Sequence, residues 1–381
     1  MASMVMRKQE AGNGPGVHVQ AVRQAMARRL LPWFDANRRD LPWRKEPREA
    51  YAVWVSEIML QQTRIEAVIP YYTRFLKVLP DIVALAAVDE DQLLKLWEGL
   101  GYYSRARNLQ KAARLVMEEY GGELPRKAAE LKRLPGIGDY TAGAIASIAH
   151  GEPEPAVDGN VLRVMTRVLA RADDIMQPGT RTDIANLLRQ CYPSGERAGL
   201  LTEGIMELGE TVCLPNAVPR CENCPLNTLC RACLQGATER YPVKSPPKDR
   251  RIEHRTVLLL RCGEKYAVRK REGKGLLAGL WEFPNLDGAL DEVQAGEVVR
   301  TLGGEVLRIE NCGEAKHIFS HVEWHMCGFL VRVEEVESAL CRSLEEKLDA
   351  QMVDRTQLEE VYAVPSAFRV YTQIAKTLVK A

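Results

Sequence analysis

Hydrophobic positions recur at helical spacing over roughly the first 210 residues of the chain. Apolar residues repeat at intervals of three and four, as they do on the buried face of a helix. This periodicity predicts helices over residues 17–37, 51–69, 91–97, 104–120, 140–149 and 161–170. Residues 1–16 are polar and glycine-rich, and a disordered tail is expected there.

The pattern changes near residue 250. Residues 241–251 contain three prolines among basic residues and predict a linker. Beyond it, alternating patterns predict strands over 255–260, 265–269, 305–310 and 323–333, with helical stretches at 287–302 and 354–361. We therefore predict an all-α domain over residues 17–238, a linker over 239–253 and an α+β domain over 254–378.

The segment Leu-Pro-Gly-Ile-Gly-Asp-Tyr-Thr-Ala, residues 134–142, combines turn residues with the start of a helix. Gly136 and Gly138 permit a tight turn, after which the N–H groups of the next helix point outward and suit a phosphate. A lone Gly-x-Gly is more often an ordinary turn between core helices. The whole segment, followed by Asp158 eighteen positions after Tyr140, indicates a DNA-binding turn beside a carboxylate.

This segment resembles the helix-hairpin-helix of the endonuclease III superfamily of base-excision DNA glycosylases. A second segment, Val-Ser-Glu-Ile-Met-Leu-Gln-Gln-Thr at residues 55–63, is similar to one in MutY-type adenine DNA glycosylases. The resemblance spans roughly residues 20–370, and its motifs occur in family order. It implies an all-α helix-hairpin-helix glycosylase domain followed by a Nudix-like domain.

Two carboxylates are candidates for the chemistry. Glu57 lies among apolar residues, where desolvation would raise its pKa, although periodicity alone favours a surface position at the helix edge. Asp158 fits a helix N-cap, which by itself would explain it. The resemblance implies that Glu57 donates a proton to the departing base, that ionised Asp158 stabilises the sugar cation, and that Asn160 orients Asp158.

Tyr140 distinguishes subclasses of the superfamily. Members that also cut the DNA strand carry a lysine there, which attacks the sugar as an amine. A phenol cannot do this, so the resemblance implies a monofunctional enzyme that uses water. Gln62, Thr63 and Tyr102 match DNA-contacting positions, with Gln62 and Tyr102 as wedges in the vacated duplex; core packing is an alternative for Tyr102.

Four cysteines, Cys213, Cys221, Cys224 and Cys230, have the spacing C-x7-C-x2-C-x5-C. Spacing alone allows structural zinc. The resemblance implies a [4Fe-4S] cluster, although the family's first spacer usually has six residues instead of seven. Because Cys233 is a fifth candidate, a ligand set of 221, 224, 230 and 233 stays open.

Within the second domain, residues 274–284 are similar to a segment of Nudix folds. The helix that should carry a Mg2+-binding glutamate cluster reads Ala-Gly-Glu-Val-Val-Arg-Thr-Leu-Gly-Gly at 295–304, which favours recognition without hydrolysis. His317, His321 and His325 recur at intervals of four, which on a helix would suggest a metal site. The resemblance instead implies that Phe319, Ser320 and His321 probe 8-oxoguanine opposite the target adenine.

Composition limits the remaining possibilities. The net charge is only +1: residues 1–250 hold 34 Lys+Arg against 30 Asp+Glu, and residues 251–381 hold 18 against 21. DNA binding must therefore come from local charge and helix ends.

The start lacks an apolar signal region and no apolar run could span a membrane, so we expect a cytoplasmic protein that contacts no membrane. Its ten cysteines then favour metal ligation or burial over disulfides.

Together these observations predict a monomeric bacterial, nucleoid-associated adenine DNA glycosylase acting on double-stranded DNA with A opposite 8-oxoguanine or G. One alternative is a thymine or uracil mismatch glycosylase of the same superfamily. The other is a non-catalytic iron-sulfur DNA-binding protein that senses redox state.

Overall fold

The computed structural model of the chain describes residues 15–246, 249–334 and 345–377. Its internal contacts divide it into two compact units. The first unit comprises Met1–Ala87 with Asn108–Pro246, and the second comprises Val88–Arg107 with Pro247–Ala381. Most of the predicted tail, residues 1–14, lies outside the described residues, as do residues 247–248 of the predicted linker; the predicted domain boundaries remain predictions.

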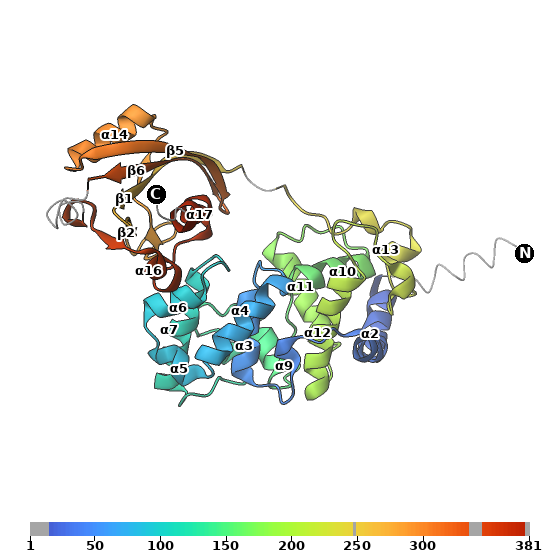
Figure 1. Cartoon of the computed structure of the whole chain (residues 1–381). Helices are drawn as coiled ribbons and strands as arrows, with labels where there is room; N and C mark the ends of the chain where they lie inside the picture. Colours follow the sequence, from blue (N-terminus) through green and yellow to red (C-terminus); the bar gives the residue numbers. More distant parts are fainter. Residues whose placement is uncertain (1–14, 247–248, 335–344, 378–381) are drawn as a thin grey trace, which may run out of the picture. The chain divides into compact units, whose positions relative to one another are not determined.

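The first unit is built of helices (Figure 1). They pack around apolar side chains from α2, α10, α11 and α12, including Met26, Met165 and Ile205. The helices described up to residue 234 are α2 (Pro15–Asn37), α3 (Ala50–Leu60), α4 (Ile65–Val78), α5 (Ile82–Ala87), α6 (Glu90–Leu96), α7 (Ser104–Glu119), α8 (Ala128–Leu131), α9 (Asp139–Ile148), α10 (Gly159–Leu169), α11 (Pro178–Arg189), α12 (Glu196–Thr211) and α13 (Arg231–Leu234). Of these, α6 and the first turn of α7 belong to the second unit.

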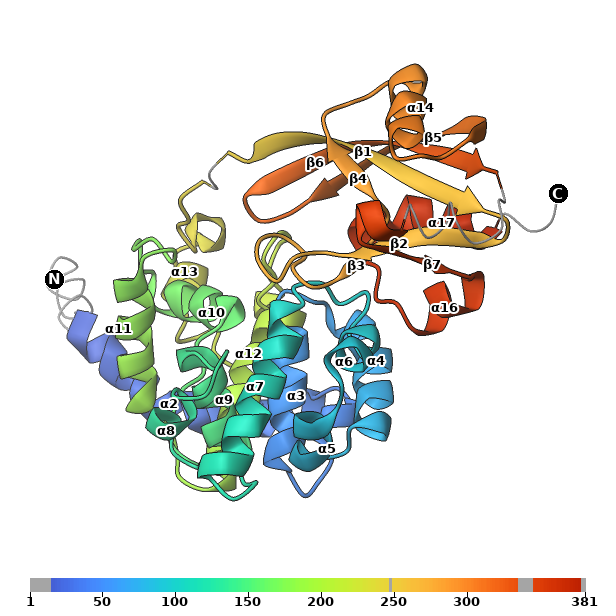
Figure 2. The same ribbon diagram turned by 90° about the vertical axis from the view of Figure 1, so that its left-hand side faces the viewer.

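The second unit contains a mixed sheet of seven described strands. Strands β1 and β6 pair in parallel along their full length, and the other pairings are antiparallel (Figure 2). The strands are β1 (Arg251–Cys262), β2 (Lys265–Lys270), β3 (Trp281–Glu282), β4 (Asn285–Asp287), β5 (Val306–Ile318), β6 (Val322–Val333) and β7 (Ala350–Val353).

Apolar side chains cover both faces of this sheet. Ala295 and Val299 of α14 (Glu292–Thr301) pack on one face against Phe329. Tyr371 of α17 (Arg369–Thr377) packs on the other against Trp324. A further short helix, α16 (Arg355–Glu360), precedes α17. The prediction of an α+β second domain is confirmed.

Two of the predicted elements are wrong in extent. The helix predicted over residues 51–69 is interrupted, because the chain turns between α3 and α4, where Gln62 has a left-handed φ of 59°. The strand predicted over 305–310 continues to Ile318, and β5 and β6 then form a hairpin. His317 and His325 therefore lie on strands and His321 in the turn between them, not on a helix. None of the helices within the described residues is long and apolar enough to cross a membrane.

Candidate active site

Glu57 is buried in the first unit, on the apolar helix α3. Its carboxyl group lines a cavity of about 490 Å³, and Tyr140 Oη of α9 donates a hydrogen bond to its Oε2 at 2.5 Å. Burial raises the pKa of Glu57 to about 7; the Tyr140 hydrogen bond opposes this, and the charges of Glu203 and Asp158 add to it. Glu57 is therefore partly protonated near neutral pH, as a proton donor requires.

Tyr140 lines the same cavity as the two candidate carboxylates. Burial, and then the charges of Glu57 and Asp158, raise the pKa of its phenol well above the ordinary value. The hydroxyl therefore stays protonated and acts as a hydrogen-bond donor to Glu57. Met206 of α12 packs beside it, with Sδ 3.9 Å from Tyr140 Oη.

Asp158 is the N-cap of α10, as predicted. Its Oδ1 accepts a hydrogen bond from the Val161 N–H at 2.7 Å, and Asn160 Nδ2 donates to its Oδ2 at 2.9 Å. Burial raises the pKa of Asp158 above its ordinary value, whereas these two hydrogen bonds and Arg163 oppose the rise. Asp158 lines the same cavity as Glu57, so the two carboxylates meet in one space.

Arg163 connects this cap to the cysteine-containing loop. It is buried and donates to Asn160 Oδ1 at 2.7 Å, to the Gly209 carbonyl at 2.9 Å and, through Nε, to the Cys213 carbonyl at 2.8 Å. Because Asn160 in turn donates to Asp158, a continuous chain of hydrogen bonds runs from the loop to the carboxylate.

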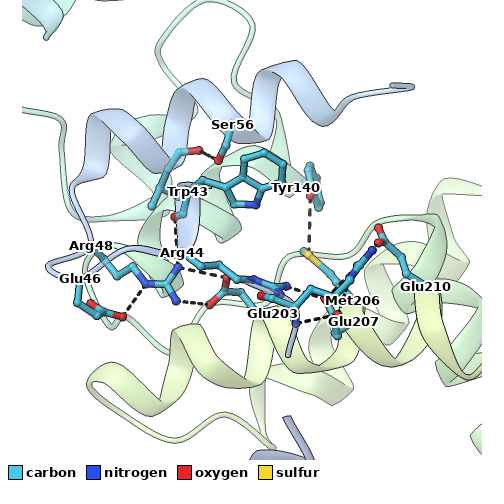
Figure 3. A network of polar contacts seen from close by, with 12 residues as sticks. Trp43, Arg44, Glu46, Arg48, Ser56, Tyr140, Glu203, Met206, Glu207 and Glu210 are labelled. Atoms are coloured by element: carbon cyan, nitrogen blue, oxygen red, sulfur yellow. Dashed lines mark hydrogen bonds and ion pairs between the residues drawn. The ribbon is translucent and has the colours of Figure 1, made fainter. Parts of the chain in front are cut away.

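A network of arginines and glutamates forms another wall of the cavity (Figure 3). Arg44 bridges Glu203 and Glu207 at 2.9 and 2.8 Å, and Arg48 contacts Glu203 at 2.9 Å. Arg39 Nε contacts Glu207 Oε1 at 2.6 Å. Burial alone would raise the pKa of Glu207, but Arg39 and Arg44 outweigh it and hold that pKa below its ordinary value.

These network residues are absent from the sequence predictions. Their arginines precede residue 50 and their glutamates follow residue 200, so no local pattern joins them. One signal was available: Glu203, Glu207 and Glu210 recur at intervals of four and three in a largely buried helix, which places three carboxylates on one face. With Trp43 beside them, these donors and acceptors suit a planar, polar heterocycle.

Four of the five residues predicted to contact DNA, namely Gln62, Thr63, Gly136 and Gly138, line a second cavity of about 770 Å³, which Asp158 also lines. Gly136 has a left-handed φ of 78°, and a Cβ there would lie 2.7 Å from Asn108 Cβ, so glycine is required. Gly138 is extended instead and is the N-cap of α9. Gln62, which is exposed, and Thr63 lie in the chain between α3 and α4 and line the same cavity as this turn.

Tyr102 and the residues predicted to probe the lesion lie together in the second unit. Tyr102 is 50% exposed and has a left-handed φ of 45°, and its Oη lies 3.3 Å from Ser320 Oγ. Both residues, with Phe319 and His321, line a cavity of about 500 Å³. Arg105 holds the Tyr102 loop by donating to the carbonyls of Leu100 and Gly101 at 2.9 and 3.1 Å.

Five cysteines of the loop after α12 line one small cavity: Cys213, Cys221, Cys224, Cys230 and Cys233. All are free thiols, and Arg167 Nη1 lies 3.3 Å from Cys213 Sγ. Among the described residues, no three His, Cys, Asp or Glu side chains are grouped so as to hold a metal ion. The donor set, thiols beside a guanidinium, nevertheless has the chemistry of an iron-sulfur loop.

Comparison with known proteins agrees with this geometry. The sequence profile described as "HhH-GPD superfamily base excision DNA repair protein" matches residues 55–190, and a NUDIX domain profile matches residues 256–373. The adenine DNA glycosylase of Mus musculus is 38% identical over 351 residues, which cover 77% of this chain and 68% of that protein. The adenine DNA glycosylase of Buchnera aphidicola subsp. Acyrthosiphon pisum is 31% identical over 308 residues, covering 80% and 85%.

Among solved structures, a thermostable thymine-DNA glycosylase matches with a TM-score of 0.50 and 27% identity. The match covers 57% of this chain and 98% of that one.

Proposed function

Because the chain belongs to the adenine DNA glycosylase family of base excision repair enzymes, we propose that it removes adenine lying opposite 8-oxoguanine or guanine in double-stranded DNA. One observation supports this most directly. Glu57, buried and with its pKa raised by that burial to about 7, lines the same cavity as Asp158, which Asn160 and the Val161 N–H hold at the start of α10. Glu57 can therefore donate a proton to an extruded nucleotide while Asp158 places a negative charge beside the same nucleotide.

The chemistry divides between the two carboxyl groups. As the C1'–N9 bond breaks, its electron pair leaves with adenine, and Glu57 supplies the proton that neutralises the base. Ionised Asp158 stabilises the positive charge left on the sugar. Water then forms a bond to C1', and its proton returns to the Glu57 carboxylate.

The product is an abasic site in an uncut strand. Tyr140 stands where strand-cutting relatives carry lysine, and burial keeps its phenol protonated. Among the described residues that line the two cavities around Asp158, none is a lysine. No amine is therefore placed to attack C1' and form an imine.

DNA would bind around the second cavity. The N-terminal N–H groups of α9, after Gly136 and Gly138, suit a backbone phosphate, and Gln62 with Thr63 would enter the duplex beside the extruded base. In the second unit, Tyr102 would also enter the duplex as a wedge, and the Phe319–His321 turn would contact the base opposite adenine.

The test is single-turnover excision on duplexes that differ in one pair: A opposite 8-oxoguanine, A opposite G, T opposite G and U opposite G. We expect adenine release from the first two and no strand cleavage until alkali is added. Release of thymine or uracil, without release of adenine, would indicate a thymine or uracil mismatch glycosylase. Binding without any excision would indicate a non-catalytic DNA-binding protein.

Ser320→Ala should reduce the preference for 8-oxoguanine over guanine opposite adenine by about 2- to 13-fold, the worth of one hydrogen bond. Point variants are better here than removal of the C-terminal part, because Lys95 of α6 donates to the Tyr362 carbonyl at 3.0 Å. The matched variant is Tyr102→Phe, which removes the same contact between Tyr102 and Ser320 but leaves the serine hydroxyl. If neither variant changes the rate ratio of the two duplexes, this turn does not read the opposing base.

A [4Fe-4S] cluster would be held by Cys213, Cys221, Cys224 and Cys230, and when bound it would stabilise the loop that Arg163 ties to Asp158. Arg163 contacts the Cys213 carbonyl, and Arg167 contacts the Cys213 sulfur. These two contacts favour Cys213 over Cys233 as a ligand. We expect about four irons per chain after anaerobic purification. Cys213→Ser should lose iron while Cys233→Ser keeps it; the reverse result would select the other ligand set, and stoichiometric zinc would reject the cluster.

A further inference from the structure

The inner face of α12 carries one carboxylate whose surroundings differ from those of its two neighbours. Glu203 and Glu207 are buried, and two arginines bind each of them. Glu210 lies one turn further along the same face, and its side chain is 33% exposed. Figure 3 shows the three side chains in this order along the helix.

Arg39 is the partner of Glu210. Its Nη2 contacts Glu210 Oε2 at 2.5 Å, while its Nε and Nη2 also bind the two oxygens of Glu207 at 2.6 and 3.0 Å. Among the described residues, none donates a hydrogen bond to the second oxygen of Glu210. Glu210 therefore shares one guanidinium with a buried glutamate and keeps a carboxylate oxygen free.

Glu210 also lines both cavities that meet at Asp158. It faces the first with Glu57 and Tyr140, and the second with Gly136 and Gly138. Gly209, the residue before it, packs against Asn160: a Cβ at Gly209 would lie 2.7 Å from Asn160 Cβ. The backbone that carries Glu210 is thus in contact with the residue that orients Asp158.

We propose that Glu210, held by Arg39, is a positioning residue for Asp158, a third carboxylate that sets the negative charge on the sugar side of the site. This inference rests on the proposed function, in which ionised Asp158 faces a sugar cation. Three arginines and four glutamates form the network, because Arg48 also binds Glu46, whose side chain is 66% exposed. Loss of the Glu210 charge would remove one of the two carboxylates that bind Arg39, and so make the charge beside the place where the cation develops more positive.

Asp158 is the group on which Glu210 acts. Burial is the largest cause that raises the pKa of Asp158, and the negative charge of Glu210 adds to it. After burial and the Tyr140 hydrogen bond, the charged groups that act most strongly on the pKa of Glu57 are different ones, namely Glu203, Asp158 and Arg44. The groups that face Asp158 come from each element around it: Glu57 from α3, Arg64 before α4, Tyr140 from α9, Arg163 from α10, Arg181 from α11 and Glu210 from α12.

The test is Glu210→Gln in the full chain, with single-turnover excision of adenine opposite 8-oxoguanine measured from about pH 4.5 to 9. Removing the negative charge lowers the pKa of Asp158, so the acidic limb of the rate profile should move to lower pH by about half a unit. The basic limb, which reports loss of the Glu57 proton, should stay in place. The rate on the plateau should fall by about 3- to 10-fold, because the cation loses a neighbouring anion.

Two further variants separate this role from general damage. Glu196→Gln removes a charge from the exposed start of the same helix and should leave the whole profile unchanged. Glu210→Asp should restore most of the plateau rate and the position of the acidic limb. If the Glu210→Gln profile superimposes on that of the wild type, or if both limbs move together, the proposal is wrong. If the wild type excises no adenine at any pH, the proposed function fails instead.

Discussion

Replacing Glu57 by glutamine should lower the single-turnover rate of adenine release by at least about 100-fold, the usual contribution of a general acid. Glutamine keeps the size of the side chain and can still accept the hydrogen bond from Tyr140, but it has no proton to give. In the wild type the rate should fall as pH rises through about 7, the pKa to which burial raises Glu57. The variant should lack this dependence.

The same substitution should stabilise the folded chain in alkaline solution. The pKa of Glu57 is raised from an ordinary 4.5 to about 7 by burial, so the folded state binds its proton more tightly than the unfolded state does. The contribution of Glu57 to stability is therefore fully present below about pH 4.5 and is lost as pH rises through 7, a loss of about 3 kcal/mol. Glutamine has no such loss.

The comparison needs three measurements on both chains: excision, mismatch binding and thermal unfolding at pH 5 and pH 8. We expect the variant to bind the mismatch normally. The melting temperature of the variant minus that of the wild type should be larger at pH 8 than at pH 5. A variant that excises adenine at near the wild-type rate would contradict the role of Glu57. One that melts lower than wild type at both pH values would show that Glu57 is needed for folding instead.

Local patterns were sufficient to predict several of the helices and the helix cap that line the cavities. Asp158 is an N-cap because its short side chain can accept from the N–H groups of the helix that follows, and the Asp-Gly-Asn order shows this without a structure. Apolar spacing located α2, α6, α7, α9 and α10 closely. The break between α3 and α4 was not visible in this way, since it depends on a left-handed backbone at Gln62, a residue type that does not mark turns.

Pairs of residues far apart in the sequence account for the part of the site that the sequence did not predict. Arg44 meets Glu203 and Glu207 across about 160 positions of sequence, and neither partner is unusual in its own segment. A buried arginine can be recognised in a sequence only when its acceptors are known, and those of Arg163 include two backbone carbonyls. Such acceptors leave no trace in residue identity, because every residue has a carbonyl.

Arg163→Gln should both destabilise the chain and reduce excision by more than about 10-fold. The guanidinium binds Asn160 Oδ1 and the carbonyls of Gly209 and Cys213, and a glutamine amide cannot reach all three. Leaving buried acceptors unpaired costs about 1 to 3 kcal/mol for each group, so a loss of about 2 to 4 kcal/mol in unfolding free energy is expected. Excision falls because Asn160, without Arg163, no longer holds the Asp158 carboxylate in place.

The matched control is Arg171→Gln, just beyond the end of α10, where the arginine is bound to the exposed carboxylates of Asp173 and Asp183. Exposed ion pairs of this kind contribute about 0 to 1 kcal/mol, so this variant should melt and excise as the wild type does. Iron content, unfolding free energy and single-turnover rate are compared for the three chains. If Arg163→Gln keeps its iron and its excision rate while losing stability, the hydrogen-bonded chain from Cys213 to Asp158 supports the fold only. If excision falls while iron is retained in full, the contacts of Arg163 with Asn160 and with the Gly209 carbonyl position the carboxylate without acting through the cluster.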